Sequence, residues 1–335
     1  MIKVAALTSG RNSPPARFRV RQYIEPLKSL GIEVHEHYPI INKYTTKRLG
    51  QAALPMRLSG VLAARVSAIA WFERELIPER VSLERFAGKK RLIDIDDAIW
   101  INRPSFSERI ASLCDGVIAG NEFIAEHYRA LGSRVWIIPT SIDTTKWRPE
   151  QSVRPSSWTV GWTGSSSNLE FLYDIEEPLA DFLADHSAAR LLIVCNRKPA
   201  FKRIPPRRWQ FARWSPGNEV SLAQRMNVGL MPLPDSQWSR GKCALKMIMY
   251  MAVGIPSVVS PIGVGRELID QYNVGLAART RDDWYARLAL FFNERETANR
   301  MGLAGRRLVE ERFSVGRNAL KLAEIFHSIA AEARV

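Results

Sequence analysis

The sequence predicts an α/β protein made of two doubly wound domains in series, each with a parallel sheet. Three observations lead to this prediction. Short apolar runs alternate with segments whose apolar residues recur at helical spacing. The alternation stops at a polar, proline-containing stretch near the middle of the chain and then starts again. The chain of 335 residues is long enough for two domains, since a domain has roughly 150 residues.

The first half of the chain is expected to form an N-terminal domain over residues 1–145. Helices are expected over Phe18–Leu30 and Glu122–Leu131, between short strands. Strands that alternate with helices form a parallel, doubly wound sheet. The predicted strands are Lys3–Leu7, Glu33–His37, Ala68–Phe72, Arg91–Ile95, Gly116–Ala119 and Val135–Ile138.

The stretch 146–157 is polar, carries Pro149 and Pro155, and is predicted to be the interdomain linker. A second domain should then occupy 158–314, and a last helix within 315–335 is expected to pack back on the first domain. The predicted strands are Trp158–Trp162, Leu191–Cys195, Arg208–Phe211, Val228–Met231, Ser257–Ser260 and Gly275–Ala277. The predicted helices are Leu169–Ala184, Ala244–Val253, Gly265–Gln271, Arg281–Asn293, Glu296–Arg312 and Val315–Ala331.

Composition indicates a globular protein of the cytoplasm. Apolar residues make up 46% and charged residues 24% of the chain. Cys114, Cys195 and Cys243 lie far apart without metal-ligand spacing, so we expect reduced thiols and no metal site. No apolar run is long enough for a membrane span, and the first residues are typical of a strand rather than of a signal peptide.

The balance of charge favours a polyanionic partner. The chain has 48 Lys and Arg against 34 Asp and Glu, a formal charge of +14. Nucleic acid, an anionic membrane surface and phosphorylated ligands all fit this charge. Residues 196–214 carry seven cations, no acid and four large aromatic residues. This composition suits a membrane surface, which we favour, or single-stranded nucleic acid; alternatively the aromatic residues belong to the core and the charges are merely solvated.

The segment 238–261 has the strongest signal for a binding site. Arg240, Lys242 and Lys246 cluster where a helix is expected to begin, and no acidic residue occurs between Asp235 and Glu267. The free N–H groups and positive dipole end of a helix, joined by three cations, favour a diphosphate. A solvated basic first turn is the plain alternative.

The run from Lys246 to Pro261, followed by Gly263–Glu267, resembles the donor-site signature of glycosyltransferase family 4. Further motifs resemble a bacterial branch of that family: Arg240–Cys243, Val160–Ser165, Asp94–Ala98, Ala119–Asn121 and Ser13–Val20. The resemblance implies the GT-B fold, in which two Rossmann-like domains face each other across a cleft. It also implies a retaining transfer from a nucleotide-sugar donor held by the second domain, with no cofactor.

One departure from the family concerns two glutamates eight residues apart, the second of which typically holds the donor ribose. The matching positions are Gly241 and Met249, so the nucleotide and its mode of binding are left open. Glu267 matches a further acidic position of the family. It is either a donor contact or an acidic residue in the first turn of a helix.

The loop Gly164–Ser165–Ser166 follows the first strand of the second domain. Small residues let a phosphate approach the backbone, and the resemblance puts this loop beside the donor diphosphate. A serine N-cap after a glycine turn would have the same sequence. We expect donor contacts from this loop and from Arg240, Lys242, Lys246 and Glu267.

Three carboxylates in four residues, Asp94, Asp96 and Asp97, end the fourth predicted strand. Alternation along a strand should point Asp94 and Asp96 to one side and Asp97 to the other. We expect Asp96 or Asp97 to contact the transferred sugar or the acceptor hydroxyl. A helix cap with an exposed turn, or an Asp-x-Asp metal site, are the alternatives.

The loop after the first strand, Gly10 to Arg21, is rich in arginine and should lie at a strand's carboxyl end. Gly10, Arg11, Arg17 and Arg19 are predicted to contact the acceptor or a phosphate. Glu73–Arg74–Glu75, after the third strand, is a lesser candidate that a surface ion pair would also explain.

The predicted function is metal-independent transfer of a hexose-type sugar, with retention, to a sugar-containing or lipid-linked acceptor in bacterial polysaccharide or glycolipid synthesis. Asp96, Asp97 and Lys246 are the predicted catalytic residues. The protein is expected in the cytoplasm, peripherally at the inner membrane face. A non-catalytic nucleotide- or nucleic-acid-binding module remains the alternative, while a nicotinamide dehydrogenase is disfavoured because no Gly-x-Gly-x-x-Gly follows either first strand.

Overall fold

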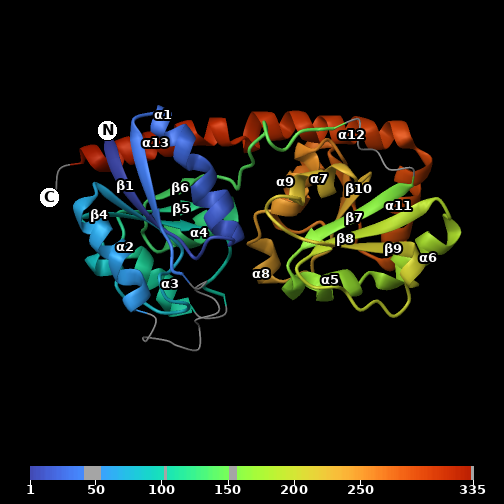
Figure 1. Ribbon diagram of the computed structural model, residues 1–335, viewed down its shortest axis with the longest axis horizontal. Helices are drawn as coiled ribbons and strands as arrows, with labels where there is room; N and C mark the ends of the chain where they lie inside the picture. Colours follow the sequence, from blue (N-terminus) through green and yellow to red (C-terminus); the bar gives the residue numbers. More distant parts are fainter. Residues whose placement is uncertain (41–53, 102–103, 151–156, 333–335) are drawn as a thin grey trace. The chain divides into compact units, whose positions relative to one another are not determined.

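The computed structural model describes residues 1–40, 54–101, 104–150 and 157–332. The chain divides into two compact units, each with a six-stranded parallel sheet flanked by helices (Figure 1). Unit 1 contains Met1–Ser141, Arg240–Cys243 and Ser314–Val335, and unit 2 contains Ile142–Ser239 and Ala244–Phe313. The predicted fold class, two Rossmann-like doubly wound domains, is therefore confirmed. Of the predicted linker, 151–156 lies outside the described residues.

The sheet of unit 1 has the strand order β2-β1-β3-β4-β5-β6. Every predicted strand of this half is present, and each bound agrees with the prediction to within one residue. The strands are β1 (Ile2–Leu7), β2 (Ile32–His37), β3 (Ile69–Glu73), β4 (Lys90–Ile95), β5 (Gly116–Ala119) and β6 (Val135–Ile137). The helices are α1 (Ile24–Ser29), α2 (Pro55–Val66), α3 (Pro104–Ala111), α4 (Glu122–Ala130) and α13 (Val315–Ala331).

Both faces of the unit 1 sheet are buried, because successive side chains of β1 point to opposite sides. Val4 and Ala6 pack with α1 and α13, and Ala5 and Leu7 pack with α2, α3 and α4. Although α13 comes last in the chain, it lies on this sheet, and Phe326 meets Trp71 edge to face at 5.2 Å.

The sheet of unit 2 has the order β12-β11-β10-β7-β8-β9. Numbered within the unit this is 6-5-4-1-2-3, the strand order of a dinucleotide-binding fold. The strands are β7 (Trp158–Gly164), β8 (Ala189–Cys195), β9 (Trp209–Arg213), β10 (Val228–Met231), β11 (Ser257–Val259) and β12 (Gly275–Ala277). The helices are α5 (Leu169–Tyr173), α6 (Glu176–Asp185), α7 (Glu219–Gln224), α8 (Gln237–Arg240), α9 (Leu245–Ala252), α10 (Gly263–Tyr272), α11 (Arg281–Asn293) and α12 (Arg295–Leu308).

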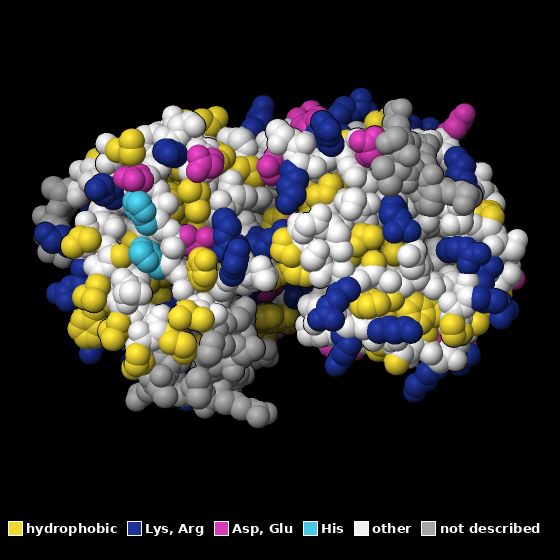
Figure 2. Space-filling model, viewed as in Figure 1, with side chains coloured by type: hydrophobic (Ala, Val, Ile, Leu, Met, Phe, Trp, Pro, Cys, Tyr) yellow, Lys and Arg dark blue, Asp and Glu magenta, His cyan; other side chains and the backbone are white. Residues whose placement is uncertain are grey.

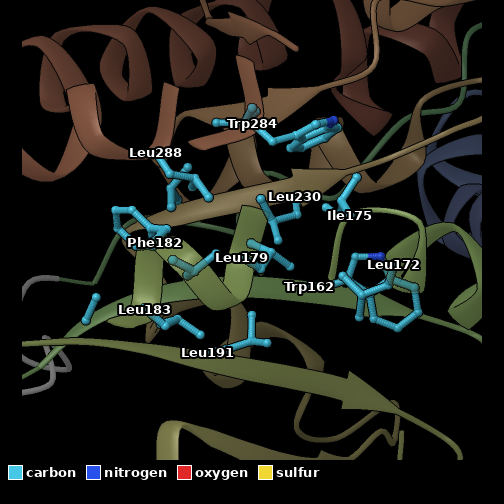
Figure 3. Packing of buried hydrophobic residues seen from close by; sticks show 14 of the residues in the cluster. Trp162, Leu172, Ile175, Leu179, Phe182, Leu183, Leu191, Leu230, Trp284 and Leu288 are labelled. Carbon is cyan, nitrogen blue, oxygen red and sulfur yellow. The ribbon is translucent and has the colours of Figure 1, made fainter. Parts of the chain in front are cut away.

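The main core of unit 2 lies between its sheet and the helices α5, α6, α11 and α12. Figure 3 shows Trp162 and Leu191 of the strands packed with Leu179 and Phe182 of α6 and Leu288 of α11. The opposite face of the sheet is covered by α7 and α9, whose Leu222 and Tyr250 pack on Leu192 and Val194 of β8.

Three predicted helices differ from the structure. The predicted helix Glu296–Arg312 ends as an α-helix at Leu308 and continues as a π-helical turn (Val309–Phe313). Residues 18–30 are not one α-helix: a π-helical turn (Ala16–Val20) and a 3₁₀ turn (Arg21–Tyr23) precede α1. The predicted helix Leu169–Ala184 is broken into α5 and α6. Pro178 explains the break, since proline has no N–H and its ring clashes with the carbonyl four residues earlier, here Asp174. Within the described residues, no helix is long and apolar enough to cross a membrane.

Candidate functional site

The loops most suited to bind a ligand are fixed by the strand orders. In unit 1 the order reverses between β1 and β3, and in unit 2 between β7 and β10. Ligands of doubly wound folds bind at this point, beyond the carboxyl ends of the strands. The predicted residue Gly10 follows β1 there, with a φ of 152° that favours glycine. The predicted loop Gly164–Ser166 follows β7 in the same way.

In unit 1, Asp96 and Asp97 are bridged by one arginine. Arg74 donates from Nε to Asp96 Oδ1 at 2.6 Å and from Nη2 to Asp97 Oδ2 at 2.6 Å. The ammonium group of Lys242 lies 3.8 Å from Asp97. Strand β4 already ends at Ile95, so alternation does not govern these two side chains. The prediction that Asp96 and Asp97 point to opposite sides is therefore wrong, because both carboxylates accept hydrogen bonds from the guanidinium of Arg74.

Glu73, Arg74 and Glu75 are buried, so a surface ion pair, the alternative explanation of this motif, is wrong. Glu73 accepts a 2.7 Å hydrogen bond from the backbone N–H of Ser9, which links the carboxyl ends of β3 and β1. Arg74 has a φ of 57°, a left-handed conformation that is strained for a residue with a long side chain. The sequence offers no local signal for this arrangement, since Arg74 and Asp96 are far apart in the chain.

The segment Arg240–Cys243 packs within unit 1 and brings three of the quoted motifs together. The side-chain amide of Asn121 donates to the carbonyl of Gly241 at 3.0 Å and to Cys243 Sγ at 3.3 Å. Cys243 Sγ lies 3.1 Å from the carbonyl oxygen of Asp96. Burial raises the pKa of the Cys243 thiol to about 12, so it is neutral at physiological pH.

Close packing also explains why no glutamate stands at position 241. A Cβ added at Gly241 would lie 2.4 Å from the Cβ of Ala98 and 3.1 Å from its backbone nitrogen. Met249, at the second glutamate position, is buried in α9. A glutamate at position 241 would therefore displace this segment, and a glutamate at position 249 would bury its carboxylate.

Arg19 does not have the position predicted for a phosphate contact. It is 1% exposed, donates from Nε to Asp94 Oδ1 at 2.7 Å and from Nη1 to the carbonyl of Ile138 at 2.6 Å. Burial raises the pKa of Asp94 to about 6, although Arg19 acts to lower it. Burial acts to lower the pKa of Arg19, but Asp94 offsets this and raises it. Arg19 therefore belongs to the core of unit 1. Its ion pair with Asp94 offsets the cost of burying the two charges.

The other two predicted arginines of this loop are accessible. Arg11 is exposed, and Arg17 is partly exposed with its guanidinium carbon 5.1 Å from the ring centroid of Phe18. Of the predicted acceptor contacts, Arg11 and Arg17 therefore reach the surface of unit 1, whereas Gly10 is buried.

In unit 2, the predicted donor residues Lys246 and Gly164 lie side by side. A Cβ added at Gly164 would be 3.1 Å from Lys246 Cε and 2.7 Å from the ring of Trp162. The ammonium group of Lys246 lies 5.9 Å from the Trp162 ring centroid, at the carboxyl end of β7. Ala244, just before α9, has a φ of 52°, and the unit boundary falls beside it. The three cations that were predicted at the start of one helix therefore belong to different units. Arg240 and Lys242 are part of unit 1, and Lys246 is part of unit 2.

Tyr250, one turn along α9 from Lys246, ties the two strands of the switch point together. Its hydroxyl accepts from the N–H of Thr163 at 3.1 Å and donates to the carbonyl of Leu230 at 3.2 Å. The ring of Tyr250 packs directly on the backbone of Gly229, where a Cβ atom would lie only 2.2 Å from the ring. This contact holds β7, β10 and α9 in register behind Lys246.

The serine loop after β7 is held by side chains that the sequence did not single out. The N–H of Ser166 donates to Asn196 Oδ1 at 2.7 Å, so this group is not available to a phosphate as predicted. Ser165 Oγ contacts Ser167 Oγ at 2.8 Å and accepts from the side chain of Asn168 at 2.9 Å. The groups of this loop that a ligand could contact are Gly164 and the side-chain hydroxyls of Ser165 and Ser166.

Glu267 is the fifth residue of α10 and is exposed, 3.9 Å from Arg312 of the same unit. The helix begins at Gly263, and a Cβ added at Gly265 would lie 2.9 Å from Met231. The small residues therefore let the start of α10 approach the carboxyl end of β10.

The basic segment 196–214 is split between core and surface. Phe201, Trp209 and Phe211 are partly buried against the main core of unit 2, and Phe201 meets Trp209 edge to face at 5.3 Å. Most of the cations are exposed; Arg208, by contrast, donates to carbonyls at the end of α6, among them that of His186 at 2.8 Å. Since the aromatic side chains serve the core, this segment forms a cationic surface rather than an aromatic one.

Within the described part of the chain, no three His, Cys, Asp or Glu side chains are grouped so as to hold a metal ion. The three cysteines are free thiols. Asp96 and Asp97 contact Arg74 and Lys242 instead.

No protein-family model matches the chain, and no curated protein matches its sequence. Solved structures do match over its whole length. Sucrose-phosphate synthase from Thermosynechococcus elongatus has a TM-score of 0.76 at 14% identity, covering 99% of this chain and 100% of its own. HepE from Anabaena, in complex with UDP-glucose, has a TM-score of 0.69 at 14% identity, covering 98% and 100%.

The fold is that of the GT-B glycosyltransferases. A putative UDP-N-acetylglucosamine 2-epimerase from Listeria monocytogenes also matches, with a TM-score of 0.66 at 11% identity over 99% of this chain and 97% of its own. At these identities the likeness concerns the GT-B fold alone, and the reaction has to be argued from the residues.

Proposed function

We propose that this GT-B protein is a glycosyltransferase that moves a sugar from a nucleotide-diphosphate donor to an acceptor hydroxyl. The observation that supports this most directly is Lys246, which lies against Gly164 at the carboxyl end of β7, where the strand order of unit 2 reverses. A cation beside a bare glycine at this point suits the diphosphate of a nucleotide sugar. The known binding of UDP-glucose by the similar protein HepE is consistent with this donor class.

In the proposed reaction the bond between the anomeric carbon and the diphosphate oxygen breaks, the acceptor oxygen bonds to that carbon, and the proton of the acceptor hydroxyl passes to the leaving diphosphate. Negative charge grows on the leaving diphosphate. Lys246, with Gly164, Ser165 and Ser166, would stabilise this charge from unit 2, with Glu267 as a further donor contact. Charge stabilisation by groups fixed in advance is usually the largest catalytic contribution.

The residues proposed for unit 1 are Asp96 and Asp97, which would contact the transferred sugar or the acceptor hydroxyl. Arg74 fixes both carboxylates, and Lys242 lies beside Asp97. Arg240 and Lys242 would add positive charge toward the donor phosphates. Gly10, Arg11 and Arg17 remain the proposed contacts to an acceptor or a phosphate.

The resemblance to glycosyltransferase family 4 supports four further proposals about the reaction. We propose retention at the anomeric carbon, a hexose-type sugar, catalysis without a metal ion, and a role in bacterial polysaccharide or glycolipid synthesis. A sugar-containing or lipid-linked acceptor, used in the cytoplasm at the inner face of an anionic membrane, is consistent with the formal charge of +14. Nucleic acid is not the proposed partner.

The first experiment is thermal unfolding in the presence of UDP, GDP, ADP or CMP, each with and without EDTA. A ligand at about 100 times its Kd stabilises the folded state by about 2.7 kcal/mol, enough to raise Tm by a few degrees. We expect one nucleotide to raise Tm, with the same shift in EDTA. A shift that EDTA abolishes would contradict metal independence. If no nucleotide shifts Tm while oligonucleotides bind with steep salt dependence, the non-catalytic nucleic-acid module replaces the proposal.

The decisive variant is Lys246→Ala, and Lys198→Ala is its matched control. Both lysines lie near a tryptophan ring of unit 2, at 5.9 Å from Trp162 and 5.6 Å from Trp209, but Lys198 is outside the β7 switch point. Lys246→Ala should lower kcat by at least about tenfold, or 1.4 kcal/mol, with an unchanged Tm. Lys198→Ala should leave kcat unchanged. Near-normal turnover of Lys246→Ala would overturn the donor-site assignment.

A further inference from the structure

Unit 1 contains a pocket that the proposed transfer does not use. It has a volume of about 500 Å³ and is lined by Leu54 just before α2, by side chains of the loop 77–86 and by the first turns of α3. The loop follows the carboxyl end of β3, and α3 follows that of β4. Sites for small molecules measure roughly 300–1,000 Å³ and, in doubly wound folds, lie beyond the carboxyl ends of strands. The pocket therefore has the size and the place of a ligand site.

Three guanidinium groups line this pocket. Arg80 and Arg85 come from the loop and Arg109 from α3, and all three residues are exposed. Within the part of the chain that the structure describes, none of the three forms an ion pair. Figure 2 shows Lys and Arg side chains spread over both units, so positive charge alone marks no site. Three cations around one pocket, however, focus a positive potential into it and attract an anion.

Glu79, the acidic residue of the lining, is half-buried and has a strained backbone. Its φ is 59°, in a turn that the N–H of Arg80 closes by donating to the carbonyl of Ile77 at 3.2 Å. Glycine or asparagine is the usual residue at this place of a turn, since other side chains disfavour a positive φ. Strain of this kind collects at binding sites, where a particular side chain is needed. A carboxylate here repels the anionic part of a ligand but accepts hydrogen bonds from hydroxyl groups.

The loop that carries these residues is held in place by buried charged groups. Glu84 is fully buried and accepts from the N–H of Leu76 at 2.9 Å and from the N–H and hydroxyl of Ser82 at 2.6 and 3.1 Å. Arg57 of α2 is buried and donates to the carbonyls of Leu76 and Thr8 at 2.9 and 2.6 Å. The wall of the pocket is thus fixed to α2 and to the end of β1 independently of a ligand, which lowers the entropic cost of binding one.

We infer that this pocket binds a small molecule that carries a phosphate monoester and hydroxyl groups. A phosphate monoester has about 1.5 to 2 negative charges at neutral pH, and the three arginines exceed the one glutamate of the lining by two charges. Guanidinium groups bind phosphate oxygens through paired hydrogen bonds. Glu79 accepts from the hydroxyl groups, and Phe86 and Phe106 cover apolar parts of the molecule. A lipid fits less well, because its hydrocarbon chain would desolvate the Glu79 carboxylate.

This inference does not rest on sugar transfer, because binding is measured without a nucleotide donor. The probes for isothermal titration calorimetry of the full chain are glucose 6-phosphate, glucose and inorganic phosphate. The test variant is Arg80→Gln/Arg109→Gln. The matched control is Arg65→Gln/Lys89→Gln, which removes two exposed cations of unit 1 outside the pocket. A second test variant, Glu79→Gly, removes the carboxylate and relieves the backbone strain, so it should not lower Tm.

We expect glucose 6-phosphate to bind the wild-type chain and the control equally, at least about tenfold more tightly than inorganic phosphate. Glucose should bind least. Arg80→Gln/Arg109→Gln should weaken the binding of glucose 6-phosphate by at least about tenfold at unchanged Tm, because charged contacts to the phosphate are lost. Glu79→Gly should weaken the binding of glucose 6-phosphate but not that of inorganic phosphate.

Three results would overturn the inference. The first is no binding of glucose 6-phosphate to the wild-type chain, and the second is equal affinity of Arg80→Gln/Arg109→Gln and the wild type. The third is a loss of binding confined to Lys246→Ala, because the phosphate would then lie at the proposed donor site of unit 2. Equal affinity for inorganic phosphate and glucose 6-phosphate would contradict the contact between Glu79 and hydroxyl groups and identify a site for the free anion instead.

Discussion

Arg19 and Asp94 neutralise each other in the interior of unit 1, where neither charge could be buried alone. Arg19 was predicted as an acceptor or phosphate contact and Asp94 only as a member of the acidic motif that ends the fourth strand, because nothing in the sequence links the two positions. Their contact at 2.7 Å, with both side chains 1% exposed, makes each residue depend on the other. A buried ion pair of this kind gives little net stability, but losing one partner leaves an uncompensated charge.

We therefore expect Arg19→Met and Asp94→Val each to lower the free energy of unfolding by about 3–5 kcal/mol. The double variant should lose much less than the sum, because an apolar pair needs no compensating charge. Urea unfolding of the four proteins gives the coupling energy. Arg266→Met, which breaks the exposed Arg266–Asp270 pair, is the control and should cost less than about 0.5 kcal/mol. Additive losses in the double variant would contradict this account.

Gly241 shows how packing at one residue constrains a binding site. Its carbonyl accepts from Asn121 and its Cα faces Ala98, so position 241 is part of the surface by which Arg240–Cys243 packs in unit 1. A side chain there would push this segment away from Asp96–Ala98. The missing glutamate is thus the consequence of a closer packing, and the proposed donor contacts must come from elsewhere.

At the scale of elements, Asn121 serves two segments at once. Its Oδ1 caps α4 by accepting from the N–H of Ile124 at 3.0 Å, while its amide nitrogen holds Gly241 and Cys243. Asn121→Asp keeps the cap but replaces the donor with a carboxylate. We expect α4 to remain intact and the segment Arg240–Cys243 to detach, since a carboxylate repels the Gly241 carbonyl.

Reactivity of Cys243 toward a thiol reagent measures this detachment. In the wild type the thiol is buried and its pKa is raised to about 12, so labelling should be slow until the protein unfolds. Asn121→Asp should speed labelling of Cys243, located by peptide mapping, with unchanged labelling of the buried Cys195. Asn121→Ser keeps a cap without the carboxylate and should give an intermediate rate. Unchanged labelling in Asn121→Asp would mean that Gly241 and Cys243 are held by other contacts.

The strands could be predicted from the sequence because each is a short apolar run between polar turns, as for Gly116–Ala119 and Val228–Met231. The helices were less predictable, because single residues and the composition of one helix obscured the helical pattern. Pro178 breaks the expected helix Leu169–Ala184, and α2 was missed because it is apolar on its outer face as well as its inner one. Amphipathic periodicity is weak in such a helix.

The arrangement of the candidate site was only partly predictable. Gly164 and Lys246 could be paired by the resemblance, and the structure puts them in contact. Arg74 with Asp96, and Asn196 with Ser166, could not, because each pair joins loops that follow different strands. Such pairings are fixed by the sheet order, which a single sequence leaves open.

At the scale of the whole molecule, the last helix belongs to the first unit. Val315, Ala319, Leu322, Phe326 and Ile329 of α13 are buried, and they close one face of the unit 1 sheet against β1 and β3 (Figure 1). Unit 1 is therefore assembled from both ends of the chain. Unit 2, in contrast, lies within the single continuous stretch 142–313, apart from Arg240–Cys243.

This difference predicts how the chain can be divided. The fragment 142–313 should fold alone, because its core draws on β7, β8 and helices α5, α6, α11 and α12 of the same stretch. It should show one cooperative thermal transition and keep the nucleotide-dependent rise in Tm of the full chain. A chain ending at Phe313 should keep the unit 2 transition but lose that of unit 1, because α13 no longer covers its sheet. If the fragment is unfolded while the chain ending at Phe313 melts like the full protein, the stability of unit 2 depends on unit 1, and α13 is dispensable.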